Sequence, residues 1–296
     1  DGTVCKYASE KPNATQEYVV HPAFTTDADQ GGGWENELAG IWIGKYEASL
    51  VNKSDGSNIV TNDTGTGDIL LSNDVDKTVA TKPGYSSWRN ITIGNSYTNA
   101  RTYSEELKSH MLKNSEWGAV AYLTDSKYGR NGEEITINNN GTTFYTGGGA
   151  DNAYITSTPQ SSTGNVYGIY DLSGNAWEYV AAAYSNRSEI ETISGSTKYA
   201  TVYDGTEVNT DYKYGDATYE TSGWHSDYAD FVTSTYPLFK RGGSYVDTTA
   251  GVFCFDPIYR RIWILFVSFS TSSVMRYLVG QSILQGWKNL PVKGSV

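Results

Sequence analysis

The chain has 296 residues, of which 38% are hydrophobic and 19% charged, so it can bury a large core and has the composition of a globular protein. Its formal net charge of −11 provides no basic stripe for a phosphate backbone, and nucleic acid is therefore not an expected partner. The 31 glycines, 24 tyrosines and 8 tryptophans indicate short strands joined by turns rather than a helical bundle.

The first hydrophobic pattern along the chain alternates from Leu38 to Val51, with the period of a half-buried strand. Residues 127–151 and 185–234 are rich in turn-forming and polar residues, and we predict irregular excursions there. The apolar run from Ile264 to Val267 predicts a buried strand. The longer run that contains it, Ile262 to Phe269, is too short to cross a bilayer, so membrane insertion is not expected.

The one clear helical pattern lies in residues 98–123. Tyr103, Leu107 and Met111 recur four apart, which places them on one face of a helix. Asn114 is suited to cap a second helix. The aromatic residues that we predict to lie in the core are Tyr103, Trp117 and Tyr122. The whole pattern predicts one elaborated α+β domain with two helices, many short strands and long loops.

Four motifs are spread along the chain, and they resemble one known family. They are GIWIGKYE (Gly40 to Glu47), NSEWGAVAYL (Asn114 to Leu123), YGIYDLSGNAWEYV (Tyr167 to Val180) and RGGSY (Arg241 to Tyr245). In this order they resemble the formylglycine-generating-enzyme branch of the C-type lectin fold. The resemblance implies that fold for residues 22–280, with residues 1–21 as an N-terminal extension and residues 281–296 as a C-terminal tail. It assigns structural roles to Asn175, Trp177, Glu178, Arg241, Gly242, Gly243 and Arg276.

The metal-binding residues of the enzymes in this branch do not match the chain. Those enzymes hold copper with a cysteine pair after the last motif, but the aligned positions here are Asp247 and Val252. Cys254 lies two residues away, and Cys5 is the only other thiol in the sequence. The three histidines, His21, His110 and His225, lack metal-ligand spacing. We therefore expect a non-enzymatic protein, with a diverged oxidoreductase as an alternative.

The segment RGGSYVDTTAGVFCF (Arg241 to Phe255) resembles the variable proteins of diversity-generating retroelements, which occur in phages, prophages and bacteria. In that family, mutation at adenines diversifies asparagine codons, and the variable side chains lie on one exposed face. Nineteen asparagines occur in residues 1–245 and none from Val246 to Lys288. The resemblance implies a hypervariable segment of about 246–279 that binds a protein or glycan on a cell surface. The protein would act on a phage virion, in receptor binding, or on a bacterial surface, and homo-oligomerisation would add avidity.

The residues themselves favour a contact surface from Asp256 to Trp263 (DPIYRRIW). A proline, an acid and two arginines are poor core material, because a buried unpaired charge is costly. Tyrosine, tryptophan and arginine are typical of binding hot spots. The predicted ligand-binding residues are Val246, Asp247, Thr248, Thr249, Asp256, Ile258, Tyr259, Arg260, Arg261, Ile262 and Trp263. A structural virion or adhesin module that uses this stretch as an oligomer interface is a further alternative.

The turn from Ser173 to Glu178 has two interpretations. In the enzyme branch this loop helps to bind calcium, so the resemblance implies a calcium site near Gly174 and Glu178, and we expect no other cofactor. The residues equally fit a left-handed turn at Gly174 or Asn175 with Trp177 in the core. Calcium needs six or more oxygens, and further carboxylates are not visible nearby in the sequence. Arg241 would then pair with Glu178, or Arg276 with a buried carboxylate.

Overall fold

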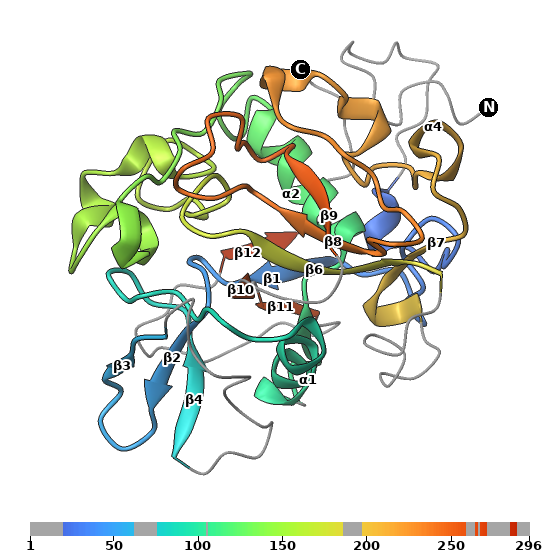
Figure 1. Ribbon diagram of the computed structural model, residues 1–296. Coiled ribbons are helices and arrows are strands. Elements are labelled where there is room, and N and C mark those ends of the chain that lie inside the picture. The colour runs from blue at the N-terminus through green and yellow to red at the C-terminus, as the bar shows by residue number, and fades with distance from the viewer. Residues whose placement is uncertain are drawn as a thin grey trace.

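A five-stranded mixed sheet lies at the centre of the protein (Figure 1). The computed structural model describes residues 20–61, 76–104, 106–185, 197–258, 264–265, 267–270 and 285–288. In order across the sheet lie β10 (Ile264–Leu265), β6 (Glu178–Tyr184), β8 (Leu238–Arg241) and β9 (Phe255–Ile258), and β7 (Thr201–Tyr203) also pairs with β6. Strand β6 runs parallel to β10 and β7 and antiparallel to β8, and β9 is antiparallel to β8.

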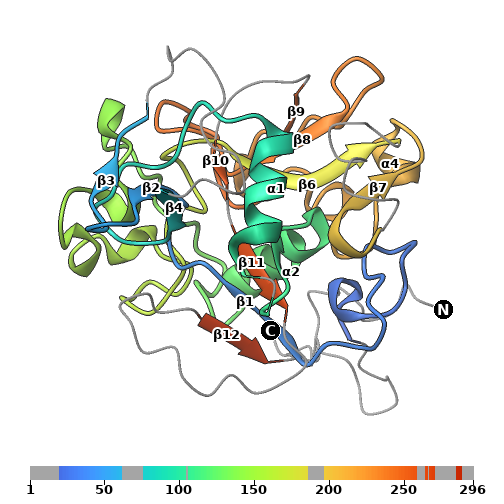
Figure 2. The same cartoon turned by 90° about the horizontal axis from the view of Figure 1, so that it is seen from below.

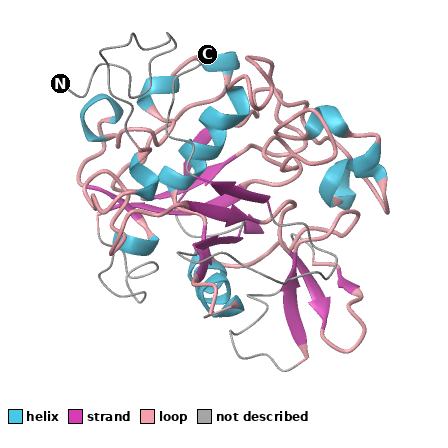
Figure 3. Ribbon diagram, turned by 180° about the vertical axis from the view of Figure 1, so that it is seen from behind, coloured by secondary structure: helices cyan, strands magenta, loops and turns pink. Residues whose placement is uncertain are grey.

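Two antiparallel sheets accompany the central one. The first has the order β12 (Gln285–Lys288), β1 (Gly40–Ile43), β11 (Val267–Ser270) and β5 (Ser109–Met111), so part of the expected C-terminal tail pairs with β1. The second has the order β3 (Asn58–Ile59), β2 (Ser49–Asn52) and β4 (Lys77–Ala80). Figure 3 shows this small sheet projecting from the body of the molecule.

The helices are few and short. They are α1 (Ile93–Tyr103), α2 (Asn114–Asp125) and α4 (Val208–Asp211). Short 3₁₀ helices span Pro22–Phe24, Gly141–Thr143, Thr146–Gly148, Ala153–Ile155, Thr158–Gln160, Thr197–Tyr199, Tyr219–Thr221 and Trp224–Ser226. None of the helices in the described ranges has the length and apolar character needed to cross a membrane. The protein is thus α+β with few helices, as the sequence predicted, and its central sheet is mixed.

Strand β6 is buried on both faces, because consecutive strand residues point to opposite sides. Tyr179, Ala181 and Ala183 belong to the same core cluster as Ile93, Tyr97 and Ala100 of α1. Val180 and Ala182 belong to the other cluster, with Trp117, Val120 and Ala121 of α2. The two helices therefore pack on opposite faces of β6, and Figure 2 shows α1 in front of the strands. Three alanines in β6 leave room for helices on both sides.

The predicted helix continues to residue 111, eight residues past the observed end of α1. Helix α1 starts at Ile93, where the Thr92 hydroxyl accepts a hydrogen bond from the Asn95 N–H at 3.2 Å, and it ends at Tyr103. Ser109–Met111 then forms β5 because it pairs with β11. Tyr103 is 43% exposed, so its predicted place in the core is wrong. Trp117 is fully buried as predicted, and Tyr122 is half-buried against the core.

Two further sequence predictions need correction. The pattern from Leu38 to Val51 is divided between β1 and β2, which lie in different sheets, because the chain turns away to bury Glu47 between them. Asn114 is the first residue of α2 rather than its cap. The helix start is closed by Glu116, whose carboxylate accepts a hydrogen bond from the Lys113 N–H at 2.9 Å. The excursion at 185–234 also contains β7 and α4.

Candidate functional site

Arg241 ends β8 and is fully buried. Its guanidinium donates hydrogen bonds to Asn114 Oδ1 at 2.7 Å, to the Ala217 carbonyl at 2.9 Å and to the Asp216 carbonyl at 2.6 Å. The side chain therefore ties β8 to the start of α2. These acceptors occupy the guanidinium, so the expected pair with Glu178 is wrong. The other expected pair, from Arg276, lies outside the described residues.

Gly242 and Gly243 turn the chain out of β8 in the left-handed region, with φ of 77° and 72°. A Cβ on Gly242 would overlap the Glu178 carboxylate, and a Cβ on Gly243 would overlap Ala250. Only glycine gives this backbone both the positive φ and the close approach. The turn thus fixes the start of the loop that follows, and its structural assignment agrees with these contacts.

Three fully buried carboxyl groups, those of Glu47, Asp171 and Glu178, lie below this turn. Glu47 accepts hydrogen bonds from the Ser87 hydroxyl, from Asn175 Nδ2 at 2.5 Å and from the Ala176 N–H at 3.3 Å. Glu178 is buried near Glu47, and the repulsion between the two carboxyls favours the protonated form. Burial raises the pKa of both glutamates well above its ordinary value and that of Asp171 to about 7.

Left-handed backbone and hydrogen bonds to the next segment fix the turn from Ser173 to Glu178. Gly174 and Asn175 have φ of 80° and 60°, the left-handed turn that the residues allowed. The Gly174 N–H donates to the Gly242 carbonyl at 2.9 Å, and the Asn175 carbonyl accepts from the Tyr245 N–H at 3.0 Å. Within the described ranges, no three His, Cys, Asp or Glu side chains are grouped so that they could hold a metal ion. Trp177 differs from its predicted core position, since it is half-buried beside Lys240.

The loop from Ser244 to Thr249 presents side chains outward from a closed turn. Val246 is 65% exposed, and Thr248 and Thr249 are also exposed. Asp247 is half-buried, and its Oδ2 accepts hydrogen bonds from the Ser244 N–H and hydroxyl, both at 2.7 Å. Of the four residues predicted to contact a ligand here, Val246, Thr248 and Thr249 have exposed side chains that a ligand could reach. The fourth, Asp247, closes the turn through its hydrogen bonds with Ser244.

The next residues hold this loop to the core from below. The Trp117 indole donates to the Val252 carbonyl at 2.7 Å, and the Ser173 hydroxyl donates to the Ala250 carbonyl. The Phe253 N–H donates to Asp227 Oδ2 at 3.0 Å. Residues 250–255 are all buried. A row of exposed side chains is thus followed by a backbone that is fixed at several points.

Asp256 and Ile258 continue the predicted site along β9 at the edge of the central sheet. Both are half-buried. Lys240, opposite Asp256 on β8, forms an ion pair with it at 2.6 Å and lies 4.0 Å from the centre of the Trp177 ring. The other predicted contact residues lie outside the described residues: Tyr259, Arg260, Arg261, Ile262 and Trp263. Lys240 and Trp177 therefore lie beside the predicted ligand-binding residue Asp256, and Lys240 contacts both of the others.

Tyr228 is a site residue that the sequence did not reveal. Its N–H donates to the Thr249 carbonyl at 3.0 Å, and its carbonyl accepts from the Phe255 N–H at 3.0 Å, so it lies between the two halves of the predicted site. Its side chain is 47% exposed. Only its membership of a tyrosine-rich stretch signalled it. We define the display face as the side chains of Trp177, Tyr228, Lys240, Val246, Thr248, Thr249, Asp256 and Ile258.

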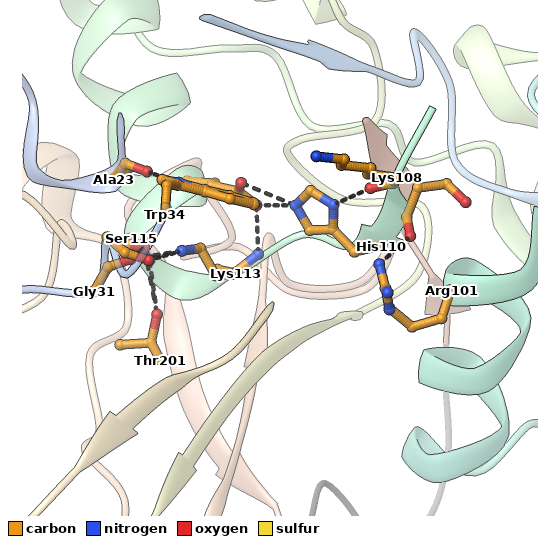
Figure 4. A network of polar contacts seen from close by, with 12 residues as sticks. Ala23, Gly31, Trp34, Arg101, Lys108, His110, Lys113, Ser115 and Thr201 are labelled. Carbon is orange, nitrogen blue, oxygen red and sulfur yellow. Dashed lines mark hydrogen bonds and ion pairs between the residues drawn. The ribbon is translucent and has the colours of Figure 1, made fainter. Parts of the chain in front are cut away.

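A second buried polar network lies at the start of α2, and it is sealed from solvent (Figure 4). Lys113 Nζ donates to the Gly31 and Gly32 carbonyls, both at 2.7 Å, and lies 4.6 Å from the centre of the Trp34 ring. His110 Nε2 is 3.0 Å from Glu116 Oε1. Burial lowers the pKa of Lys113 to about 8. These groups hold the segment before β1 to α2, so their role is structural.

Comparison with known proteins adds no assignment to this geometry. A scan of family models finds none that matches the chain, and a search of curated proteins finds no matching relative. The function is therefore argued from the display face, the scaffold beneath it and the motif resemblance.

Proposed function

We propose that the protein is a non-enzymatic ligand-binding protein of the C-type lectin fold, formylglycine-generating-enzyme branch. Its variable segment, about residues 246–279, would display diversified side chains toward a protein or glycan on a cell surface. The protein would belong to a phage virion or to a bacterial surface. One observation carries the proposal. The side chains of Val246, Thr248 and Thr249 are exposed, and the backbone that directly follows them is held to the core by hydrogen bonds at Val252 and Phe253.

This arrangement suits a face whose side chains vary. The backbone of residues 250–255 is held by Trp117, Asp227 and Tyr228, so its conformation does not depend on the exposed side chains. Because the loop is ordered before binding, little entropy is lost when a ligand binds. Tyr228 and Trp177 add large aromatic surfaces of the kind that dominates binding hot spots.

The positions of the four motifs support the proposed fold. Glu47 of the first motif accepts hydrogen bonds from Asn175 of the third. Asn114 of the second motif accepts one from Arg241 of the fourth. Residues far apart in the sequence thus meet around β6 and β8 and form the support of the display face. A shared support of this kind is what the resemblance implies for these residues.

The diverged-oxidoreductase alternative has less support in the described residues. Burial raises the pKa of the Cys254 thiol, which favours the unreactive thiol over the thiolate. The two positions aligned with the copper-binding cysteines hold Asp247, which closes a turn, and the buried Val252. A copper titration combined with thiol counting separates the two functions. We expect no stoichiometric copper binding by Cys254, and tight binding that protects this thiol would favour the enzyme.

Two surface-displayed libraries test the proposal on folding alone. The first randomises Val246, Thr248 and Thr249, and the matched control randomises Ala250, Val252 and Phe253. We expect most members of the first library to resist proteolysis like the parent and most members of the control to be degraded, because only the control positions are buried. If the first library is degraded as extensively as the control, the loop is a structural element and the display proposal fails.

A further inference from the structure

Two carboxyl groups meet beside Gly251, within the fixed part of the loop below the display face. A Cβ on Gly251 would overlap both oxygens of Asp227 and Oε1 of Glu134. Because glycine has no Cβ, the two carboxyls can occupy this space beside residue 251. Asp227 comes from the segment that also carries Tyr228, and Glu134 comes from the chain after α2. The contact thus joins three segments that are distant in sequence.

Oxygens of both carboxyls lie against the Cβ position of Gly251, so the two groups repel each other unless one of them carries a proton. Asp227 is 8% exposed, and its Oδ2 also accepts the Phe253 N–H at 3.0 Å. Burial, followed by the charge of Glu134, raises the pKa of Asp227 to about 8. The Asp227 carboxyl therefore lies against Glu134 on one side and accepts a hydrogen bond from the backbone of the loop on the other.

We propose that Asp227 and Glu134 form a proton-dependent latch, which holds residues 246–254 in the closed geometry described above and releases them when the pair loses its proton. Without that proton, two carboxylates would face each other beside Gly251 and repel. The functional meaning rests on the proposed display function, since the latch would regulate the order of the same face. The latch itself is independent of any ligand.

Among the described residues, no cation forms an ion pair with either carboxyl. Arg130 donates to the Glu134 carbonyl at 3.4 Å and pairs with the Glu133 carboxylate at 3.5 Å. His225 is paired with Asp125 at 2.8 Å. The titratable and charged groups on the segments that carry the pair and the loop include Asp125, Arg130, Glu133, His225, Tyr228, Asp247 and Cys254. The proton is therefore the group that relieves the repulsion.

The sign of the pH effect follows from the direction of the shift. A carboxyl whose pKa is raised in the folded state binds its proton more tightly there than in the unfolded chain. Its contribution to stability is complete below the ordinary value of 3.8 and is lost as the pH rises through about 8. The loop is thus expected to be closed in mildly acidic and neutral solution and to loosen in alkaline solution.

Hydrogen exchange of the full chain on either side of pH 8 tests the latch, after correction for intrinsic exchange. We expect protection of the Phe253 amide to fall by about tenfold or more above that pH in the wild type. Glu134→Gln and Asp227→Asn each replace one carboxyl by a neutral amide and so remove the repulsion without needing a proton, and protection should be nearly independent of pH in both. Glu133→Gln is the matched control on the neighbouring carboxylate, which is exposed like Glu134 but pairs with Arg130, and it should behave like the wild type.

Three outcomes overturn the latch. The first is equal protection on both sides of pH 8 in the wild type, and the second is the wild-type loss persisting in both Glu134→Gln and Asp227→Asn. The third is restoration of protection at high pH by calcium chloride in the wild type but not in Glu134→Gln, which would make the pair a cation site. None of these results bears on the loop libraries, so the latch and the display proposal can fail separately.

Discussion

Gly242 is a position at which the scaffold has no room for a side chain. Its φ of 77° is in the left-handed region, and the Glu178 carboxyl occupies the place of a Cβ. Gly223 has nearly the same φ, 82°, but nothing lies within 4 Å of its Cβ position. An alanine at either position has the strain of a positive φ, but only an alanine at Gly242 also overlaps a neighbouring side chain. Comparing the two variants therefore separates the energetic cost of backbone strain from that of steric overlap.

Gly242→Ala is expected to lower the free energy of unfolding by about 3 kcal/mol, because strain at positive φ adds to overpacking against a buried carboxyl. Gly223→Ala should cost about 1 kcal/mol, from the backbone term alone. Urea unfolding of both variants measures the difference. Equal losses in the two variants would mean that the contact of Gly242 with Glu178 is unimportant.

At the scale of elements, α2 connects the central sheet to the segment before β1. The helix packs on one face of β6, and Lys113 immediately before it holds the Gly31 and Gly32 carbonyls (Figure 4). A buried ammonium with two carbonyl acceptors makes charge-assisted hydrogen bonds, which are stronger than neutral ones. The position of this segment thus depends on Lys113 and on Ser115, whose hydroxyl also donates to the Gly31 carbonyl at 2.7 Å.

Lys113→Met keeps the apolar stem of the side chain but removes the ammonium donor from the Gly31 and Gly32 carbonyls. The Gly31 carbonyl keeps the Ser115 hydroxyl as a donor. We expect a loss of about 3 kcal/mol in the free energy of unfolding and faster hydrogen exchange at the Gly32 and Trp34 amides. Lys198→Met is the matched control, because Lys198 pairs with the exposed Glu35 at 2.7 Å and such surface pairs contribute at most about 1 kcal/mol. A control loss as large as that of Lys113→Met would contradict the anchoring role.

The elements also show how far the sequence predicts this fold. The short strands, the two main helices and the α+β class follow from glycine and aromatic content and from local periodicity. The region before Met111 does not, because a four-residue spacing fits a helix while the pairing of β5 with β11 comes from distant residues. Asn114 was expected to cap a helix, but Arg241 and Tyr203 engage its side chain across the core.

The site was predictable in part for the same reason. Val246, Thr248 and Thr249 are exposed as expected, since a motif places them in a loop. Asp247 closes that loop, a local contact that composition does not reveal. Tyr228 joins the face through backbone pairing with Thr249 and Phe255, and no sequence pattern encodes such a contact.

At the scale of the whole molecule, buried carboxyls make stability depend on pH. Asp171 accepts hydrogen bonds from Asn138 Nδ2 at 2.8 Å and from the Gly147 N–H at 2.9 Å, and burial raises its pKa from 3.8 to about 7. Because the folded state binds the proton more tightly, stability falls as the pH rises from about 4 to about 7. Burial lowers the pKa of His21 to about 4, and its effect has the opposite sign in mildly acid solution.

Asp171→Asn removes one titrating group and keeps a side-chain acceptor. The fall in unfolding free energy between about pH 4 and pH 7 should shrink by an amount on the order of 3 kcal/mol, as judged by urea unfolding at a series of pH values. Asp230→Asn, on an exposed carboxylate, serves as the control and should leave the curve unchanged. An unchanged curve in Asp171→Asn would show that this carboxyl is ionised in the folded protein at low pH.

The central claim, that the exposed loop is diversified for binding, is tested most directly by sequencing the DNA next to the gene. We expect a reverse transcriptase gene and a near-copy of the segment that encodes Val246 to Val279, differing from it at adenines. The differences should include codons of the exposed residues Val246, Thr248 and Thr249 and spare the buried Ala250, Val252 and Phe253. Absence of the near-copy and of the reverse transcriptase, or differences spread equally over exposed and buried codons, would contradict the account.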